Sequence, residues 1–220
     1  MPVQFFVPCY VDQQAPEAAL QVAGLFDRLG VAWEYPAEQT CCGQFALTVG
    51  DLATARRLMR HFLRVFGGEG DIVCPSPSCT LMVRHHYPEL AEGLAERRQA
   101  ERVAARILEL SEWLAARSPL PWKTAFAGVL ALHRSCKAKR LGVCPAATRV
   151  LAQVQGLTLR EVSPYYACCG FGGPFSYQHP DLLVSLDLSC LLHLRAVAAG
   201  HRPALGLHYL AELLQPDEDG

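Results

Sequence analysis

The chain has 220 residues, of which 51% are hydrophobic and 19% charged, and its formal net charge is −1. This length suits one large domain or two small ones, and the balanced charge without a Lys/Arg block argues against a nucleic-acid-binding protein. No apolar run approaches the roughly 18–20 residues of a transmembrane segment, and the N-terminus lacks the features of a signal peptide. We therefore expect a cytoplasmic protein, which reaches a membrane only through partners.

The first half of the sequence predicts strands that alternate with helices. Short apolar runs predict buried strands, and an apolar stripe at helical spacing predicts a helix. The expected elements are a strand at Val3–Pro8, a helix at Glu17–Leu29, a strand at Val31–Tyr35, a helix at Asp51–Phe66, a strand at Asp71–Cys74 and a helical segment that opens at Cys79.

The second half repeats the beginning of this order, with a strand at Gly128–His133, an amphipathic stretch at Ala146–Gln155 and a strand at Leu157–Val162. Alternation of strands and helices indicates an α/β fold with a mainly parallel sheet. We predict two pseudo-symmetric repeats, each a small sheet flanked by helices, with domains at residues 1–120 and 125–220.

The spacing of the cysteines reveals an internal repeat in the sequence. The pair Cys41-Cys42, followed by Gly43, begins 32 positions after Cys9, and the pair Cys168-Cys169, followed by Gly170, begins 32 positions after Cys136. A further cysteine, preceded by serine, follows each pair: Cys79 in the first half and Cys190 in the second. The segment before Cys190 is 16 residues shorter than its counterpart, so the second repeat is a shortened one.

Clustered cysteines in a reducing compartment indicate metal binding or redox chemistry more often than disulfides. Loops at the carboxyl edge of a parallel sheet converge, which would gather the three cysteine-bearing segments of each half. The candidate metal ligands are Cys9, Cys41, Cys42, Cys79, Cys136, Cys168, Cys169 and Cys190. Cys74 is an additional candidate, although a buried strand residue explains it as well, and Cys144 has no counterpart in the other repeat and is interpreted as structural.

Thiolates gathered around one point fit either zinc or an iron–sulfur cluster. Adjacent cysteines are awkward ligands for one ion but can reach different irons of a cluster, which favours the cluster and leaves zinc open, including zinc in one half only. Gly43 and Gly170 allow the backbone to turn after each pair, and Gly172 and Gly173 suit a tight loop over a cluster.

The double C-x31-C-C-G motif, with a later Ser–Cys pair, resembles the CCG cysteine-rich domain. That domain occurs in tandem in heterodisulfide reductase, in the iron–sulfur component of glycolate oxidase and in lactate utilisation protein A. The stretches VPCYVD, EQTCCGQ, PSPSC and CCGFGGPFS are most similar to the last of these. The family's fuller motif ends in C-x2-C, whose first position is Ser76 in one half and Asp187 in the other.

The resemblance implies one or two iron–sulfur clusters per chain, of the 4Fe-4S type, held by the candidate cysteines. It also implies companion subunits and a small hydroxy acid handled by the complex. Without a flavin or nicotinamide fingerprint, the first hypothesis is an electron-transfer subunit of a complex that oxidises L-lactate or glycolate. The alternatives are a thiol–disulfide reductase of the heterodisulfide reductase kind and a zinc-stabilised scaffold, so whether the chain is itself an enzyme stays open.

Overall fold

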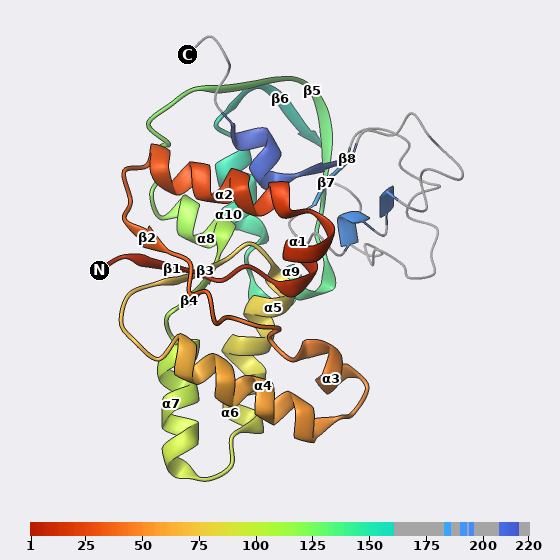
Figure 1. Ribbon diagram of the computed structural model, residues 1–220. Coiled ribbons are helices and arrows are strands. Elements are labelled where there is room, and N and C mark those ends of the chain that lie inside the picture. Colours follow the sequence, from red (N-terminus) through yellow and green to blue (C-terminus); the bar gives the residue numbers. More distant parts are fainter. Residues whose placement is uncertain (161–182, 186–189, 193, 196–206, 216–220) are drawn as a thin grey trace.

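The computed structural model describes residues 1–160, 183–185, 190–192, 194–195 and 207–215. Helices and strands alternate through both halves of the described chain (Figure 1). In chain order the elements are β1 (Val3–Phe5), α1 (Cys9–Gln14), α2 (Pro16–Arg28), β2 (Trp33–Glu34), α3 (Gln44–Thr48), α4 (Leu52–Val65), β3 (Ile72–Cys74), α5 (Pro77–Leu81), the π-turn η1 (Met82–His86), α6 (Tyr87–Leu90), α7 (Leu94–Ala104), β4 (Ile107–Glu109), α8 (Leu110–Ala115), β5 (Thr124–His133), α9 (Cys136–Leu141), α10 (Cys144–Leu151), β6 (Val154–Arg160), β7 (Leu183–Ser185), β8 (Leu207–Tyr209) and the 3-10 turn η2 (Leu210–Leu214).

Two parallel sheets with the same strand order confirm the predicted fold class. The first sheet runs β2-β1-β3-β4 and the second runs β6-β5-β7-β8, and every strand pair in both is parallel. The first strand of each half therefore lies between its second and third strands. A short helical segment follows the fourth strand directly in each half, α8 after β4 and η2 after β8. The two halves are thus pseudo-symmetric α/β repeats.

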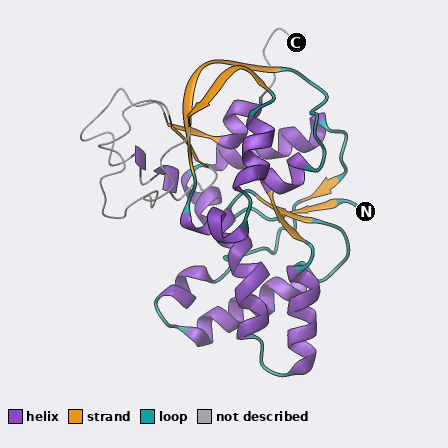
Figure 2. Cartoon of the chain, turned by 180° about the vertical axis from the view of Figure 1, so that it is seen from behind, coloured by secondary structure: helices purple, strands orange, loops and turns teal. Residues whose placement is uncertain are grey.

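A layer of helices between the two sheets forms a core that both halves share. In Figures 1 and 2, α2, α8 and α10 lie between the first sheet and the strands β5 and β6. Phe26 of α2 and Trp113 of α8 are fully buried there, with ring centroids 5.0 Å apart. A second core lies on the other face of the first sheet, where Met59 and Phe62 of α4 pack with Tyr87 of α6.

The predicted elements are found, with shifted ends. The first strand stops at Phe5, and Cys9 begins α1, a short helix that the sequence did not indicate. The amphipathic stretch expected at Ala146–Gln155 is the helix α10 at Cys144–Leu151. Its Pro145 suits the first turn of a helix, and Val154 instead begins β6, where it pairs with Thr124. The domain boundary between residues 120 and 125 stays a prediction.

The strand positions locate the 16-residue difference between the repeats. Residues 44–71 separate Gly43 from β3 and include α3 and α4, whereas only residues 171–182 separate Gly170 from β7. Cys79 comes seven positions after Ile72, the first residue of β3, and Cys190 comes seven positions after Leu183, the first residue of β7. The shortening therefore precedes β7, and Cys190 keeps the register of Cys79.

The shared core yields a test of stability. Phe26→Ala should lower the free energy of unfolding by about 3–5 kcal/mol, because it leaves a cavity where the ring met Phe5, Trp33 and Trp113. Leu20→Ala on the same helix is the matched control: its side chain is 72% exposed, so the change should stay within about 0.5 kcal/mol. Urea unfolding followed by circular dichroism measures both, and equal losses would contradict the proposed core.

Candidate metal centre

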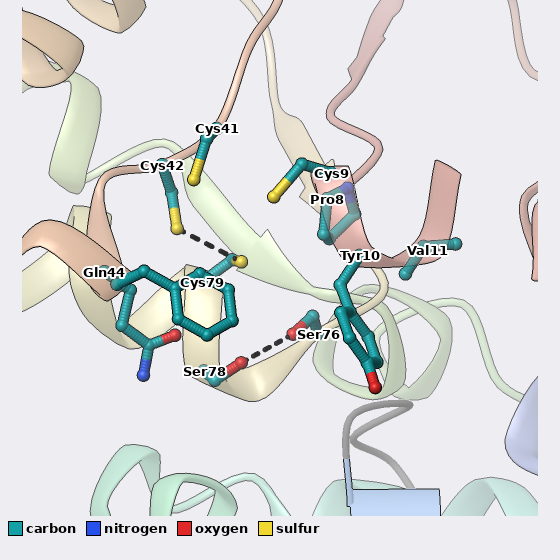
Figure 3. Close-up of a pocket in the computed structure, with 11 residues that line it drawn as sticks. Pro8, Cys9, Tyr10, Val11, Cys41, Cys42, Gln44, Ser76, Ser78 and Cys79 are labelled. Atoms are coloured by element: carbon teal, nitrogen blue, oxygen red, sulfur yellow. Dashed lines mark hydrogen bonds between the residues drawn. The ribbon is translucent and has the colours of Figure 1, made fainter. Parts of the chain in front are cut away.

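Three segments bring four thiols of the first repeat to one cavity. Cys9 begins α1, Cys41 and Cys42 lie in the loop that precedes α3, and Cys79 lies in α5. Figure 3 shows their sulfur atoms facing a common space. The cavity has a volume of about 50 Å³, which corresponds to a few water molecules. Its lining residues are Pro8, Cys9, Tyr10, Val11, Cys41, Cys42, Gln44, Phe45, Ser76, Ser78 and Cys79.

The four sulfur atoms form a row of neighbours. The Sγ atoms of Cys42 and Cys79 lie 3.2 Å apart, within hydrogen-bonding distance for two sulfurs. The thiols of Cys9 and Cys42 both hydrogen-bond to Cys41. The Gly43 N–H also donates to the Cys41 sulfur, at 3.4 Å. Among the described residues, no group of three or more His, Cys, Asp or Glu side chains is arranged so that it could hold a metal ion.

Gly43 makes the turn that presents the cysteine pair. Its φ is +85°, in the left-handed region that favours glycine, and an added Cβ would lie 3.4 Å from the Ala55 carbonyl oxygen of α4. The chain turns there into α3, which leaves Cys42 buried at 2% exposure and Cys41 half-buried. The role predicted for this glycine, to let the backbone turn after the pair, agrees with its conformation.

Hydrogen bonding divides the thiols into donors and an acceptor. The pKa of Cys41 is held far below that of an ordinary thiol, because the Cys42 and Cys9 thiols and the Gly43 N–H all donate to its sulfur. The pKa values of Cys9 and Cys42 are raised, first because each thiol proton is held by Cys41 and then because burial disfavours the charge. Cys41 is therefore the cysteine that is ready, as a thiolate, to bind a cation.

The other wall of the cavity carries hydroxyl groups. Ser76 occupies the position where the family motif has a cysteine, and its Oγ lies 2.9 Å from the Oγ of Ser78 (Figure 3). Cys74 ends β3, fully buried, and its thiol faces the Ser76 carbonyl oxygen at 3.7 Å without lining the cavity. Cys144 lies in the core that the two halves share, as a structural cysteine would.

In the second repeat the structure describes only part of the predicted site. Cys136 begins α9 and is exposed, and Cys190 is buried. The predicted residues Cys168, Cys169, Gly170, Gly172 and Gly173 lie outside the described residues. The helix α9 packs against α5, so the segments that carry Cys136 and Cys79 are neighbours. Across the same boundary, the Tyr209 hydroxyl donates to the Pro75 carbonyl oxygen at 2.7 Å.

Sequence reasoning missed the polar residues around the thiols. Tyr10 and Gln44 line the cavity beside predicted ligands, so adjacency to the cysteines could have indicated them. Tyr87 is different: its hydroxyl donates to the Cys42 carbonyl oxygen at 3.0 Å from a helix 45 positions later in the chain. No local pattern in the sequence points to that contact.

Comparison with known proteins identifies the family. The model of the CCG cysteine-rich domain matches residues 3–84 and 130–191, two segments that contain all eight predicted ligands. The chain belongs to the CCG cysteine-rich domain family. It is 29% identical to lactate utilization protein A 2 of Bacillus cereus (strain Q1) and 32% identical to lactate utilization protein A of Geobacillus kaustophilus. Each match covers 97% of this chain and 98% of the relative.

In the part of the chain that the structure describes, no helix is both long and apolar enough to span a membrane.

The low pKa of Cys41 can be tested by alkylation of the metal-free protein under anaerobic conditions. Because Cys41 is already a thiolate, its rate of reaction with iodoacetamide should change little between about pH 6 and pH 8. An ordinary thiol would react roughly tenfold faster for each pH unit in this range. Peptide mass spectrometry separates the sites.

Cys144 is the control for this measurement, because burial raises its pKa and keeps it slow to react. A tenfold rise per pH unit at Cys41 would show that its neighbours do not lower its pKa.

Proposed function

We propose that this member of the CCG family is an iron–sulfur electron-transfer subunit of a complex that oxidises a small hydroxy acid of the L-lactate or glycolate type. The observation that carries the proposal is the convergence of four thiols, from three separate segments, around one cavity at the edge of a parallel sheet. The chain itself supplies redox chemistry, and the substrate is handled by the complex.

The donors around this cavity fit an iron–sulfur cluster. Cysteine thiolates are the usual ligands of such clusters, and a row of sulfurs allows adjacent cysteines to reach different irons. Cys9, Cys41, Cys42 and Cys79 would hold a cluster of the 4Fe-4S type. When bound, it would accept and release single electrons. Gly43 contributes a backbone N–H to one ligand sulfur, and the burial of Cys42 limits the access of water.

A second cluster in the shortened repeat is part of the proposal. Its ligands would be Cys136, Cys168, Cys169 and Cys190. Two observations support it: Cys190 keeps the register of Cys79 relative to the preceding strand, and the family model covers these four positions. The contact between α5 and α9 puts the two cysteine-bearing helices side by side, an arrangement that suits electron transfer between two centres.

Companion subunits would supply the dehydrogenating centre and the electron acceptor. The names of the relatives refer to lactate utilization, which is the basis for the proposed substrate class. Exposed apolar side chains on α3 support a docking role: Phe45 lines the cavity but is 65% exposed, and Val49, at the end of the same helix, is 80% exposed. Such a complex would place the protein in the cytoplasm, with any membrane contact made through its partners.

One feature favours a second function, thiol–disulfide reduction at the cluster. Ser76 stands where the family motif has a cysteine, and its hydroxyl pairs with that of Ser78 on one wall of the cavity, which would leave an iron open to a substrate sulfur. That function predicts a change in the visible spectrum of the oxidised cluster when a thiol product is added. An unchanged spectrum across a panel of thiols and disulfides would exclude it.

The decisive test is the iron, zinc and acid-labile sulfide content of anaerobically purified protein. We expect about four to eight irons per chain with matching sulfide and a visible absorption band. Cys41→Ser should remove the iron and sulfide that the first repeat binds, and Cys168→Ser should remove those of the second. Cys144→Ser is the matched control, a buried cysteine away from the cavity, and should keep the full content.

Zinc in stoichiometric amount, without iron or colour, would instead make the chain a zinc-stabilised scaffold. Zinc in one half with a cluster in the other would limit electron transfer to a single centre.

A further inference from the structure

Tyr87 connects two of the cysteine-bearing segments. Its side chain is fully buried, and its hydroxyl donates to the Cys42 carbonyl oxygen at 3.0 Å. The Phe62 ring of α4 meets the Tyr87 ring edge-on, with centroids 5.4 Å apart. The helix that carries Cys79 is thereby joined to the loop that carries Cys41 and Cys42.

A π-turn explains how Tyr87 comes to face this loop. The segments α5, η1 and α6 follow one another without a break from Pro77 to Leu90, with the π-turn at Met82–His86. In a regular α-helix, Cys79 and Tyr87 would lie about 80° apart around the axis, because each residue turns the chain by about 100°. A π-turn absorbs about one extra residue, which reduces this angle to about 20°. The irregular turn therefore puts both side chains on one face.

The peptide group between Cys42 and Gly43 links the Tyr87 hydroxyl to the sulfur of Cys41, a proposed ligand. Among the described residues, the only cis peptide bond is Ser118–Pro119, so the bond from Cys42 to Gly43 is trans. In a trans peptide the C=O and the N–H point in opposite directions. While Tyr87 holds the Cys42 carbonyl on one side, the Gly43 N–H is aimed at the Cys41 sulfur on the other, at 3.4 Å.

We propose that Tyr87 is a positioning residue that sets the reduction potential of the cluster in the first repeat, acting through the Cys42–Gly43 peptide. The inference rests on the proposed function, that these cysteines hold an iron–sulfur cluster. Hydrogen bonds to cluster sulfurs raise the reduction potential because they stabilise the more negative, reduced form. A donor to the peptide carbonyl polarises the N–H on its other side and strengthens that bond.

The sequence of the second repeat has no tyrosine at the position that corresponds to Tyr87. Tyr87 comes eight positions after Cys79, and the residue eight positions after Cys190 is Ala198, which has no hydroxyl to donate. The two centres of one chain would therefore respond differently to the same substitution. The redox signal of the second repeat serves as an internal reference.

The test compares Tyr87→Phe with Phe62→Leu in the full chain, reconstituted anaerobically with iron and sulfide. The signal that Cys41→Ser abolishes identifies the first centre. Tyr87→Phe keeps the ring but removes the donor, so the midpoint potential of this centre should shift to a more negative value, and iron release to a chelator should become ~10-fold faster. Phe62→Leu loosens the same packing without touching a hydrogen bond, so it should lower the melting temperature and leave the potential unchanged.

A second measurement does not need the cluster. In the metal-free protein, hydrogen–deuterium exchange of the Gly43 amide should be roughly tenfold faster in Tyr87→Phe than in the wild type, because the peptide plane is no longer held. An unshifted potential in Tyr87→Phe, an equal shift in both variants, or unchanged exchange at Gly43 would overturn the inference and leave the cluster in place. Wild-type protein that binds no iron would overturn the proposed function itself.

Discussion

Packing of α2 and α8 against α10 and η2 is the contact on which the rest of the molecule depends. Each sheet has only four strands, and neither could bury its inner face alone, so the two repeats share one apolar core around Phe26 and Trp113. This packing also brings α5 against α9. The Tyr209 hydroxyl then ties the second sheet to the Pro75 carbonyl, just ahead of α5. The shared core, which contains few cysteines, thus determines where the cysteine-bearing segments lie.

In the cavity, electrostatics limits how many of the thiols can carry a charge. Four neighbouring thiols cannot all ionise without a cation, so in the protein alone Cys41 takes the negative charge while Cys9 and Cys42 keep their protons. A bound metal centre would release those protons and replace the thiol hydrogen bonds with bonds to metal. The Gly43 N–H needs no such exchange, since it serves a thiolate and a metal-bound sulfur equally well.

Spacing and hydrophobic period predicted much of this arrangement, because both are local or repeated in the sequence. The 32-residue interval recurs in both halves, and the apolar stripe of Asp51–Phe66 predicted α4 to within a residue at each end. What escaped prediction depends on tertiary contacts. The helix α1 is only six residues long, and the π-turn at Met82–His86 leaves no periodic pattern, so the alignment of Tyr87 with Cys79 could not be predicted from a regular helix.

The shortened repeat makes the two predicted centres unequal. In the first repeat, α4 supplies Phe62 behind Tyr87 and Ala55 against Gly43, so the cysteine loop is packed from below. The 16 residues absent from the second repeat fall on the segment that would correspond to α3 and α4, and its Cys136 is exposed where Cys9 is half-buried. Because solvent exposure of the ligands is one of the factors that set the reduction potential of a cluster, the proposed second centre would differ in potential from the first. Unequal potentials are what a chain needs if it is to pass electrons in one direction from one centre to the other.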